Sequence, residues 1–446
     1  MIRRRDLALR GLTALAAAVA LAAPATANAA EKSIWGPLTL AAGESAFPTY
    51  AQLGVDTFQM QLTWDSIART QPANPTDPAD PAYRWPAAVT TASREAAANG
   101  IRLALLVTGA PAWANGNRSR IWAPTNPADY ADFITAAATR YSNVRRWMIW
   151  GEPNMAVRFQ PQEADSGVSA QAYAPILDAS YDALKRVSPR NIVIGGMTWT
   201  GGDVKPSQFV RELRLPDGRP PRLDWFGHNP YPYRQPLLSG VPVEGFRDIS
   251  DLDTFAAEID AAYGRANPVP IWLSEFMIQS DQPSENFTTF VTPETQADWL
   301  TAGFRIADSF QDGRVRGVGW FTFVDQPPAA LSSNWGLMTS AFEPKPAYAA
   351  FAAAPSERNA PRVSVARTVR RSTLAGAGLA VRLTPRTAGL HSVQLLRGTR
   401  VLATGRTQSS RAITLRLRRT SLTAGRYLIR VASPRGSTIV LPLKVR

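Results

Sequence analysis

The chain has 446 residues, no cysteine and two histidines, and its formal net charge is +14. This length exceeds what one hydrophobic core normally supports, so we expect one large domain and one smaller one. The absence of cysteine excludes disulfides, thiol nucleophiles and Cys-ligated zinc, and two histidines are too few for a multi-histidine metal centre. The search for reactive groups therefore turns to carboxylates.

The first 29 residues have the pattern of an export signal. Four arginines, at positions 3, 4, 5 and 10, accompany the apolar run LTALAAAVALAA, and the small-residue sequence ATANAA follows. Cleavage after Ala29 fits the preference for small residues at a processing site. We expect residues 1–29 to be removed and the mature protein to be secreted, either free or associated with the cell wall. The sequence does not decide between a twin-arginine signal and an ordinary one, and it predicts no membrane span.

Short β-branched or aromatic runs then alternate with alanine-rich segments of helical period. The predicted strands are, in chain order, 33–35, 55–61, 102–108, 145–150, 192–197, 223–228, 271–275 and 315–323. The predicted helices are 87–98, 127–140, 170–187, 253–263, 295–310 and 345–353. Eight strands alternating with helices predict an α/β fold of the (β/α)8 barrel type.

The connections that follow strands are long, and those that follow helices are short and turn-like. This asymmetry is typical of a barrel whose binding site lies at the C-terminal ends of its strands. An open doubly wound sheet would show a similar alternation, but no glycine-rich phosphate loop follows an early strand.

A charge break marks a second domain. From Arg358 to Arg446 there are nineteen lysines or arginines and no acidic residue, so the rest of the chain is net negative. Residues 30–354 are predicted to form the barrel, 355–362 a proline-flanked linker, and 363–446 a small basic domain. Its alternating segments, such as 410–418 and 426–431, predict an antiparallel β-sandwich.

Two glutamates lie where predicted barrel strands end. Glu152 follows the fourth strand in RRWMIWGEPN, and Glu275 ends the seventh in VPIWLSEFM. One such glutamate would often form only a loop salt bridge, but two, both near tryptophans and at the same barrel face, favour a catalytic pair. Cleavage of a glycosidic bond needs such a pair, because the leaving oxygen must be protonated while the anomeric carbon is attacked from the opposite face.

With these motifs the chain resembles the clan A glycoside hydrolases, most of all families 39 and 5. The resemblance extends over roughly residues 34–354 and is carried by WGEPN and LSEF. It implies a retaining enzyme that needs no metal or organic cofactor, with Glu152 as acid/base and Glu275 as nucleophile. It also implies an oligo- or polysaccharide substrate.

The resemblance also indicates a set of substrate-binding residues. GHNPYP contains His228 and Tyr231, which resemble a strand-six pair beside the nucleophile, and GWFTFVD contains Trp320, which resembles the aromatic platform under the sugar. Trp113 in GAPAWA resembles another wall. His228 could instead be a buried structural histidine, and Trp64, Trp113 and Trp320 could equally belong to the core. Flat sugar faces stack on aromatic rings, so Trp64 and Trp335 are further candidates, and Gln61 is a polar one. Asn154 could hydrogen-bond the sugar in place of an asparagine before Glu152, but only if its loop turns it inward.

One position departs from the family pattern. These families usually have asparagine immediately before the acid/base glutamate, whereas this chain has Gly151. That asparagine would hydrogen-bond the 2-hydroxyl of the sugar. A barrel that binds polysaccharide without turnover therefore remains an alternative.

The basic C-terminal domain suggests one more partner. It could attach the protein to an anionic cell-wall polymer, although a solvated arginine-rich face would have the same composition. Nucleic-acid binding is not expected, because the arginines are spread through strands without a recognised motif. We expect a monomer.

Overall fold

The computed structural model describes residues 29–446 except 165, 239–241, 265, 267, 285–286, 328–331, 399, 418–421 and 435–437. Apart from Ala29, the predicted export signal lies outside the described residues. In the part of the chain that the structure describes, no helix is long and apolar enough to cross a membrane.

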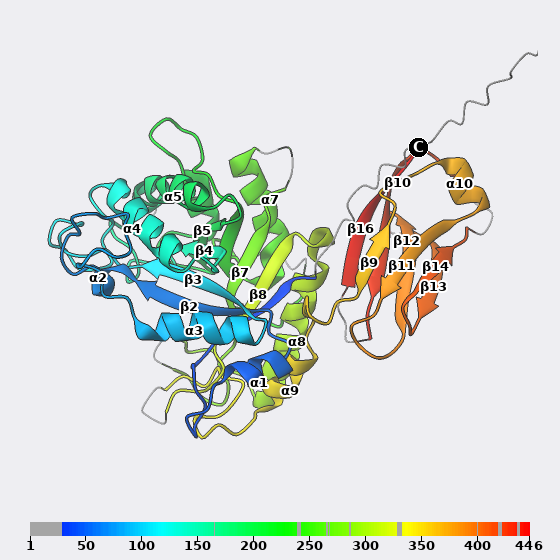
Figure 1. Cartoon of the computed structure of the whole chain (residues 1–446), viewed down its shortest axis with the longest axis horizontal. Coiled ribbons are helices and arrows are strands. Elements are labelled where there is room, and N and C mark those ends of the chain that lie inside the picture. The colour runs from blue at the N-terminus through cyan, green and yellow to red at the C-terminus, as the bar shows by residue number, and fades with distance from the viewer. Residues whose placement is uncertain are drawn as a thin grey trace, which may run out of the picture.

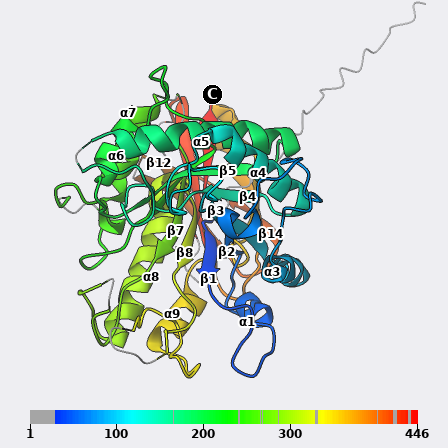
Figure 2. The same cartoon turned by 90° about the vertical axis from the view of Figure 1, so that its left-hand side faces the viewer.

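Eight parallel strands close into a barrel, which confirms the predicted fold (Figures 1 and 2). They pair in chain order, and β1 pairs with β8 to complete the ring. The strands are β1 (Glu31–Trp35), β2 (Thr57–Thr63), β3 (Arg102–Thr108), β4 (Arg146–Ile149), β5 (Ile192–Trp199), β6 (Trp225–Asn229), β7 (Ile271–Phe276) and β8 (Val315–Trp320).

Helices surround this ring. Six of them match the predicted segments: α3 (Ala87–Ala98), α4 (Pro127–Arg140), α5 (Val168–Val187), α7 (Leu252–Tyr263), α8 (Pro293–Ser309) and α9 (Pro346–Ala353). The sequence did not predict the short elements, because one or two turns carry too little periodicity to recognise. These are α1 (Phe47–Gln52), α2 (Trp64–Ile67), α6 (Pro206–Glu212), η1 (Ile249–Asp251) and η2 (Phe310–Asp312).

The barrel has two separate apolar layers. Side chains that alternate along each strand point either into the ring or out toward the helices. The inner layer is small and includes Leu106, Met148, Ile194, Met197 and Trp272. The outer layer, between sheet and helices, is much larger and forms the main core. The direction of a strand side chain therefore decides whether it can reach a site at the mouth of the ring.

Residues beyond α9 form the predicted sandwich. One sheet has the order β10-β16-β15-β12-β13 and the other β14-β11-β9, and every pairing is antiparallel except that of β10 with β16. The elements are β9 (Arg362–Val365), β10 (Thr368–Val369), α10 (Arg371–Gly376), β11 (Leu379–Thr384), β12 (His391–Arg397), β13 (Arg400–Thr407), β14 (Arg411–Leu415), β15 (Gly425–Ala432) and β16 (Thr438–Val445). In β11 buried and exposed residues alternate strictly, which leaves arginine and threonine side chains on the outer face.

The sandwich lies at the end of the barrel where the strands begin (Figure 1). The segment predicted to be a linker is packed against that end. Asp56, which precedes β2 and is buried, accepts backbone N–H groups of Glu357 at 2.7 Å and Arg358 at 2.9 Å. Arg358 in turn donates to the carbonyl of Asn99 at 2.6 Å. The opposite end of the barrel, where the strands finish, is left free.

The hydrogen bonds to Asp56 determine where the chain can be cut to remove the sandwich without destabilising the barrel. A protein ending at Ala360 keeps both hydrogen bonds to Asp56, and we expect it to fold and retain activity on small substrates. A protein ending at Ala354 loses them, and two hydrogen bonds to a charged group are worth about 3 kcal/mol or more. Thermal unfolding of the two shortened proteins beside the full chain measures this difference. Equal melting temperatures of the two would contradict the assigned role of Asp56.

Candidate active site

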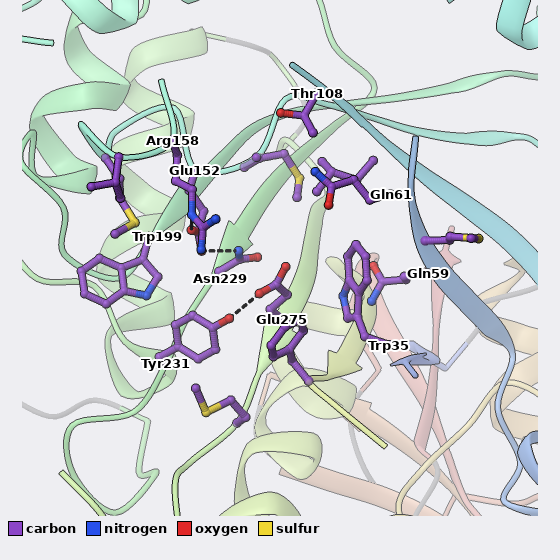
Figure 3. Close-up of a pocket in the computed structure, with 18 of the residues that line it drawn as sticks. Trp35, Gln59, Gln61, Thr108, Glu152, Arg158, Trp199, Asn229, Tyr231 and Glu275 are labelled. Atoms are coloured by element: carbon purple, nitrogen blue, oxygen red, sulfur yellow. Dashed lines mark hydrogen bonds and ion pairs between the residues drawn. The ribbon is translucent and has the colours of Figure 1, made fainter. Parts of the chain in front are cut away.

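A cavity of about 710 Å³ opens where the barrel strands end (Figure 3). Both predicted catalytic glutamates line it, together with side chains from all around the ring. Those used below are Trp35, Gln59, Gln61, Leu106, Arg120, Arg158, Trp199, Asn229, Tyr231, Phe321 and Trp335.

A tight turn after β4 brings Glu152 to the cavity. Trp150 and Glu152 have φ values of 58° and 51°, in the left-handed region that non-glycine residues seldom adopt. The amide of Glu152 donates to the carbonyl of Met197 at 2.9 Å, which ties the turn to β5. Strained backbone of this kind is concentrated at functional sites, where the surrounding structure holds it.

Glu275 is held through the backbone of its neighbour. The carbonyl of Ser274 accepts the side-chain amide of Gln59 at 2.7 Å and the indole N–H of Trp35 at 3.1 Å. Gly319 on β8 leaves room for this arrangement, since a Cβ there would lie 2.2 Å from the Ser274 oxygen. The pairing of β7 with β8 is irregular at this point. Residues of β1, β2 and β8 thus hold the backbone that precedes Glu275.

Different partners bind the two carboxyl groups. Asn229 Nδ2 donates to Glu152 Oε1 at 2.9 Å, and Arg158 Nε lies 3.4 Å from Glu152 Oε2. The hydroxyl of Tyr231 donates to Glu275 Oε2 (Figure 3). Asn229 Oδ1 is buried, and within the described part of the chain it has no hydrogen-bond partner.

The electrostatics of the pair favour sharing one proton. Burial raises the pKa of both carboxyl groups, and the nearby charge of Glu152 raises the pKa of Glu275 further, to about 8. Hydrogen bonding by Asn229 and the charge of Arg158 oppose the rise in the pKa of Glu152, as Tyr231 does for Glu275. Two such groups titrate as a pair, so near neutral pH they hold about one proton between them. One acid and one carboxylate, side by side, can perform general acid catalysis and nucleophilic attack.

No group of three or more His, Cys, Asp or Glu side chains suited to a metal ion occurs among the described residues. The prediction that no metal or organic cofactor is needed stays a prediction.

Comparison with known proteins supplies the fold family. No family model and no curated protein matches the chain. The solved structure of a family 39 glycoside hydrolase from the gut symbiont Bacteroides cellulosilyticus WH2 matches over 93% of this chain and 79% of that chain. Its TM-score is 0.56 at 17% identity. The chain therefore shares the overall fold of this family 39 glycoside hydrolase. At this identity the likeness concerns the fold alone.

Two other solved structures are more distant. Xylanase 10B from Thermotoga maritima matches over 73% of this chain and 94% of that chain, with a TM-score of 0.48 at 13% identity. A β-glucuronidase from Bacteroides uniformis matches over 94% of this chain and 46% of that chain, with a TM-score of 0.46 at 13% identity, so this chain spans less than half its length.

Within this fold, the predicted substrate-binding residues divide into two groups. Gln61, Tyr231 and Trp335 line the cavity, as does Gly151. The other five do not: Trp320, His228, Asn154, Trp64 and Trp113.

The prediction that Trp320 forms the aromatic platform is displaced by one residue along the chain. Trp320 is fully buried in the outer layer, packs against Phe276, and donates its indole N–H to the carbonyl of Trp335 at 3.1 Å. Phe321, the next residue, lines the cavity. Because side chains alternate along a strand, an error of one position moves a side chain from the site to the core.

The prediction that His228 binds substrate is also displaced by one residue. Its ring packs on Phe255 of α7, and its nitrogens contact Thr198 and the carbonyl of Arg247 at 2.8–2.9 Å. Burial lowers the pKa of this histidine to about 4, so it is neutral and structural. Asn229 is the residue that faces the cavity and contacts Glu152.

The other three residues that do not line the cavity also have packing roles. Asn154 is buried and binds the backbone of the loop after β5, accepting from the Trp199 amide at 2.9 Å and donating to Gly201 at 2.8 Å. Trp64 is buried and stacks on Phe133 of α4. Trp113 packs edge-on against Trp64 and donates its N–H to a backbone carbonyl. These side chains support the loops around the cavity without lining it.

Sequence reasoning missed several cavity residues, above all Trp35, Trp199, Asn229 and Arg158. Trp35 is the last residue of a predicted strand, and Trp199 is the last residue of β5, which runs two residues beyond its predicted end. A tryptophan at the end of a strand was the signal that could have identified both. Arg158 lies in an irregular loop, where no pattern indicates direction.

Proposed function

We propose that the protein is a secreted retaining glycoside hydrolase that cleaves O-glycosidic bonds of a β-linked glycan. The observation that carries this proposal is the pair of partly buried glutamates that line one cavity from the ends of β4 and β7. The fold supports it, since its barrel opens at that same end.

The reaction follows a double displacement. Glu275 attacks the anomeric carbon while Glu152 donates its proton to the departing glycosidic oxygen, which leaves a covalent glycosyl-enzyme. Glu152, now a carboxylate, then removes a proton from water, and that water displaces Glu275. Retention requires carboxyl groups about 5–5.5 Å apart, whereas inversion requires about 6.5–9.5 Å.

A screen of the mature protein against aryl β-glycosides and against plant and bacterial polysaccharides tests the proposal. We expect hydrolysis of at least one member, with the β-anomer formed first when the reaction is followed by proton NMR. An α-anomer as the first product would overturn the retaining mechanism, and the chain lengths of the products separate endo from exo action.

Gly151 supports one alternative, a barrel that binds polysaccharide without turnover. Glycine there provides no side chain to hydrogen-bond a substrate hydroxyl. Binding of a polysaccharide that the protein never hydrolyses, in the same screen, would favour this alternative. The presence of both glutamates in one cavity favours the enzyme.

Gly151 also allows a direct test of specificity. A Cβ at this position would lie 3.2 Å from Leu106 Cδ2, so the Gly151→Asn variant fits after a small shift of a flexible side chain. We expect the added amide to change the ratio of kcat/KM between 2-hydroxy and 2-deoxy glycosides by about tenfold, the size of one hydrogen bond. Equal effects on both substrates would indicate that the position does not contact the 2-hydroxyl.

The hydroxyl of Tyr231 should influence how activity depends on pH. Its hydroxyl donates to the Glu275 carboxylate and so favours the ionised form. In Tyr231→Phe the pKa of Glu275 rises, so the acidic limb of the kcat/KM profile should move to higher pH by about one unit. Tyr233→Phe is the control, since Tyr233 lies on the same loop but is 39% exposed and does not line the cavity. An unchanged acidic limb in Tyr231→Phe would contradict the assignment.

The proposal includes export and an accessory role for the sandwich. Exposed Arg426 and Lys444 pair across β15 and β16, and Arg430 lies four residues further along the same face of β15. No acidic residue is present in this domain to neutralise them. We propose that the sandwich attaches a monomeric enzyme to an anionic cell-wall polymer while the cavity faces away. Binding to cell walls that does not weaken with added salt would contradict this, because exposed charges are screened within about 10 Å at 0.1 M salt.

A further inference from the structure

Two arginines stand on one wall of the cavity. The loops that follow β3 and β4 are joined by backbone hydrogen bonds, from Gln160 to Ile121 at 2.8 Å and from Ala123 to Gln160 at 2.7 Å. Arg120 comes from the first loop and Arg158 from the second, and both line the cavity. In the ring, β7 with Glu275 lies on the opposite side from these strands.

Arg158 is well placed to bind a ligand. Its backbone carbonyl accepts the indole N–H of Trp150 at 3.0 Å, which fixes the start of its side chain. The side chain is 61% exposed and approaches Glu152 through Nε at 3.4 Å. A guanidinium has five N–H donors in a planar fork that matches a carboxylate or a sulfate. Arg120 binds Asp65 at 3.0 Å and is 47% exposed, so it also has accessible donors.

The contact between Arg158 and Glu152 opposes the chemistry required of Glu152. An acid must carry its proton when the glycosidic bond breaks, whereas a neighbouring guanidinium favours the ionised carboxylate. Asn229 Nδ2, which donates to the same carboxyl group, acts in the same direction. Without substrate, the proton of the pair is therefore drawn toward Glu275. A substrate group that competes for Arg158 would remove part of this bias.

We propose that the leaving-group side of the cavity binds a sugar residue with an anionic group, a carboxylate or a sulfate, through Arg158 and Arg120. Binding moves the guanidinium away from Glu152, so the proton held by the pair moves from Glu275 to Glu152, which later donates it to the glycosidic oxygen. In a variant without the Glu275 carboxyl group, Glu152 takes up this proton from solvent. The anionic group is on the leaving-group side because Arg158 contacts Glu152, the residue that protonates the departing oxygen. This inference rests on the proposed function for the meaning of that side, but its binding step does not depend on turnover.

The experiment measures binding by calorimetry with the Glu275→Gln variant of the mature chain, so that no hydrolysis interferes. The probes are β-linked oligosaccharides from glucuronoxylan, hyaluronan and mannuronan, each compared with its carboxyl-reduced counterpart, and a sulfated xylan oligosaccharide. We expect at least one carboxylated or sulfated probe to bind at least tenfold more tightly than its neutral counterpart. Which of the two is preferred identifies the anion.

Arginine variants locate the effect. In Arg158→Met the advantage of the anionic probe should disappear, and in Arg120→Met it should fall, while affinity for the neutral probes stays within about twofold. Arg118→Met is the matched control and should keep the advantage. Arg118 lies on the same loop as Arg120, but it stacks on Trp122 and does not line the cavity. Calorimetry in two buffers of different ionisation enthalpy should also show proton uptake with the anionic probe, lost in Arg158→Met.

The outcomes separate this inference from the proposed function. If no anionic probe binds more tightly than its neutral counterpart, or if Arg158→Met keeps the advantage, the inference is overturned, even when neutral glycosides are hydrolysed. If an anionic probe binds through Arg158 but the wild-type protein cleaves nothing, the anion site stands and hydrolysis is what fails.

Discussion

Replacing Glu275 with alanine is expected to abolish turnover on every substrate, with kcat lower on the order of 10⁶-fold, the scale seen when a catalytic nucleophile is removed. Without this carboxylate no glycosyl-enzyme can form, so a better leaving group does not help. The measurement compares initial rates on aryl glycosides whose phenols differ in acidity. The loss should be equally severe for all of them.

The Glu275 result has two controls. Ser274→Ala changes the preceding residue but keeps the backbone carbonyl that Gln59 and Trp35 bind, so its activity should remain much closer to that of the wild type. Added azide should rescue Glu275→Ala, if at all, with formation of the inverted α-glycosyl azide. A variant that still hydrolyses activated substrates at near wild-type rates would remove Glu275 from the role of nucleophile.

Replacing Glu152 with alanine should have a different effect, because an activated phenol departs with little help from an acid. We expect a loss of about 10²–10⁴-fold on glycosides with poor leaving groups, the usual contribution of general acid catalysis. With dinitrophenyl glycosides the first step should survive, and a burst of phenol should be followed by slow hydrolysis of the intermediate for lack of a general base. Stopped-flow detection of the phenol measures both phases.

Azide distinguishes the two roles. In Glu152→Ala a small anion can enter the space of the missing carboxylate and attack the glycosyl-enzyme, which yields a β-glycosyl azide with retained configuration. The pH profile should also lose its basic limb, because the proton donor is gone. If Glu152→Ala instead loses activity equally on all leaving groups and gains nothing from azide, Glu152 is not the acid/base. The two residues would then need to exchange roles.

The roles have a consequence for pH that the structure explains. Burial raises the pKa of both carboxyl groups, so the pair holds about one proton near neutrality. Activity should fall at low pH, when both groups are protonated, and at high pH, when both are ionised. Arg158 influences which of the two carboxyl groups holds the proton. We therefore expect an anionic substrate to change the protonation of Glu152 as well as to bind more tightly.

The sequence by itself predicted the barrel and the position of its site. Parallel strands that are buried on both faces are continuous apolar runs, and the long connections all lie on one side. That is enough to place Glu152 and Glu275 at the same mouth, because every strand of a barrel ends there. The charge break near Arg358 likewise predicted a second domain, and the alternating segments within it predicted the sandwich. These features depend on local pattern and connectivity alone.

The surroundings of the pair were decided only in three dimensions. Trp320 and Phe321 are neighbours of similar character, as are His228 and Asn229, and in each pair the second residue faces the cavity. A fully buried strand shows no polar alternation to reveal which side chains point inward, so a shift of one residue cannot be detected from its sequence. Arg158 approaches Glu152 because the loops after β3 and β4 pair with each other, and that contact depends on tertiary packing. The order of residues along the chain therefore predicts which residues carry the chemistry, whereas the tertiary structure determines which groups control their protons.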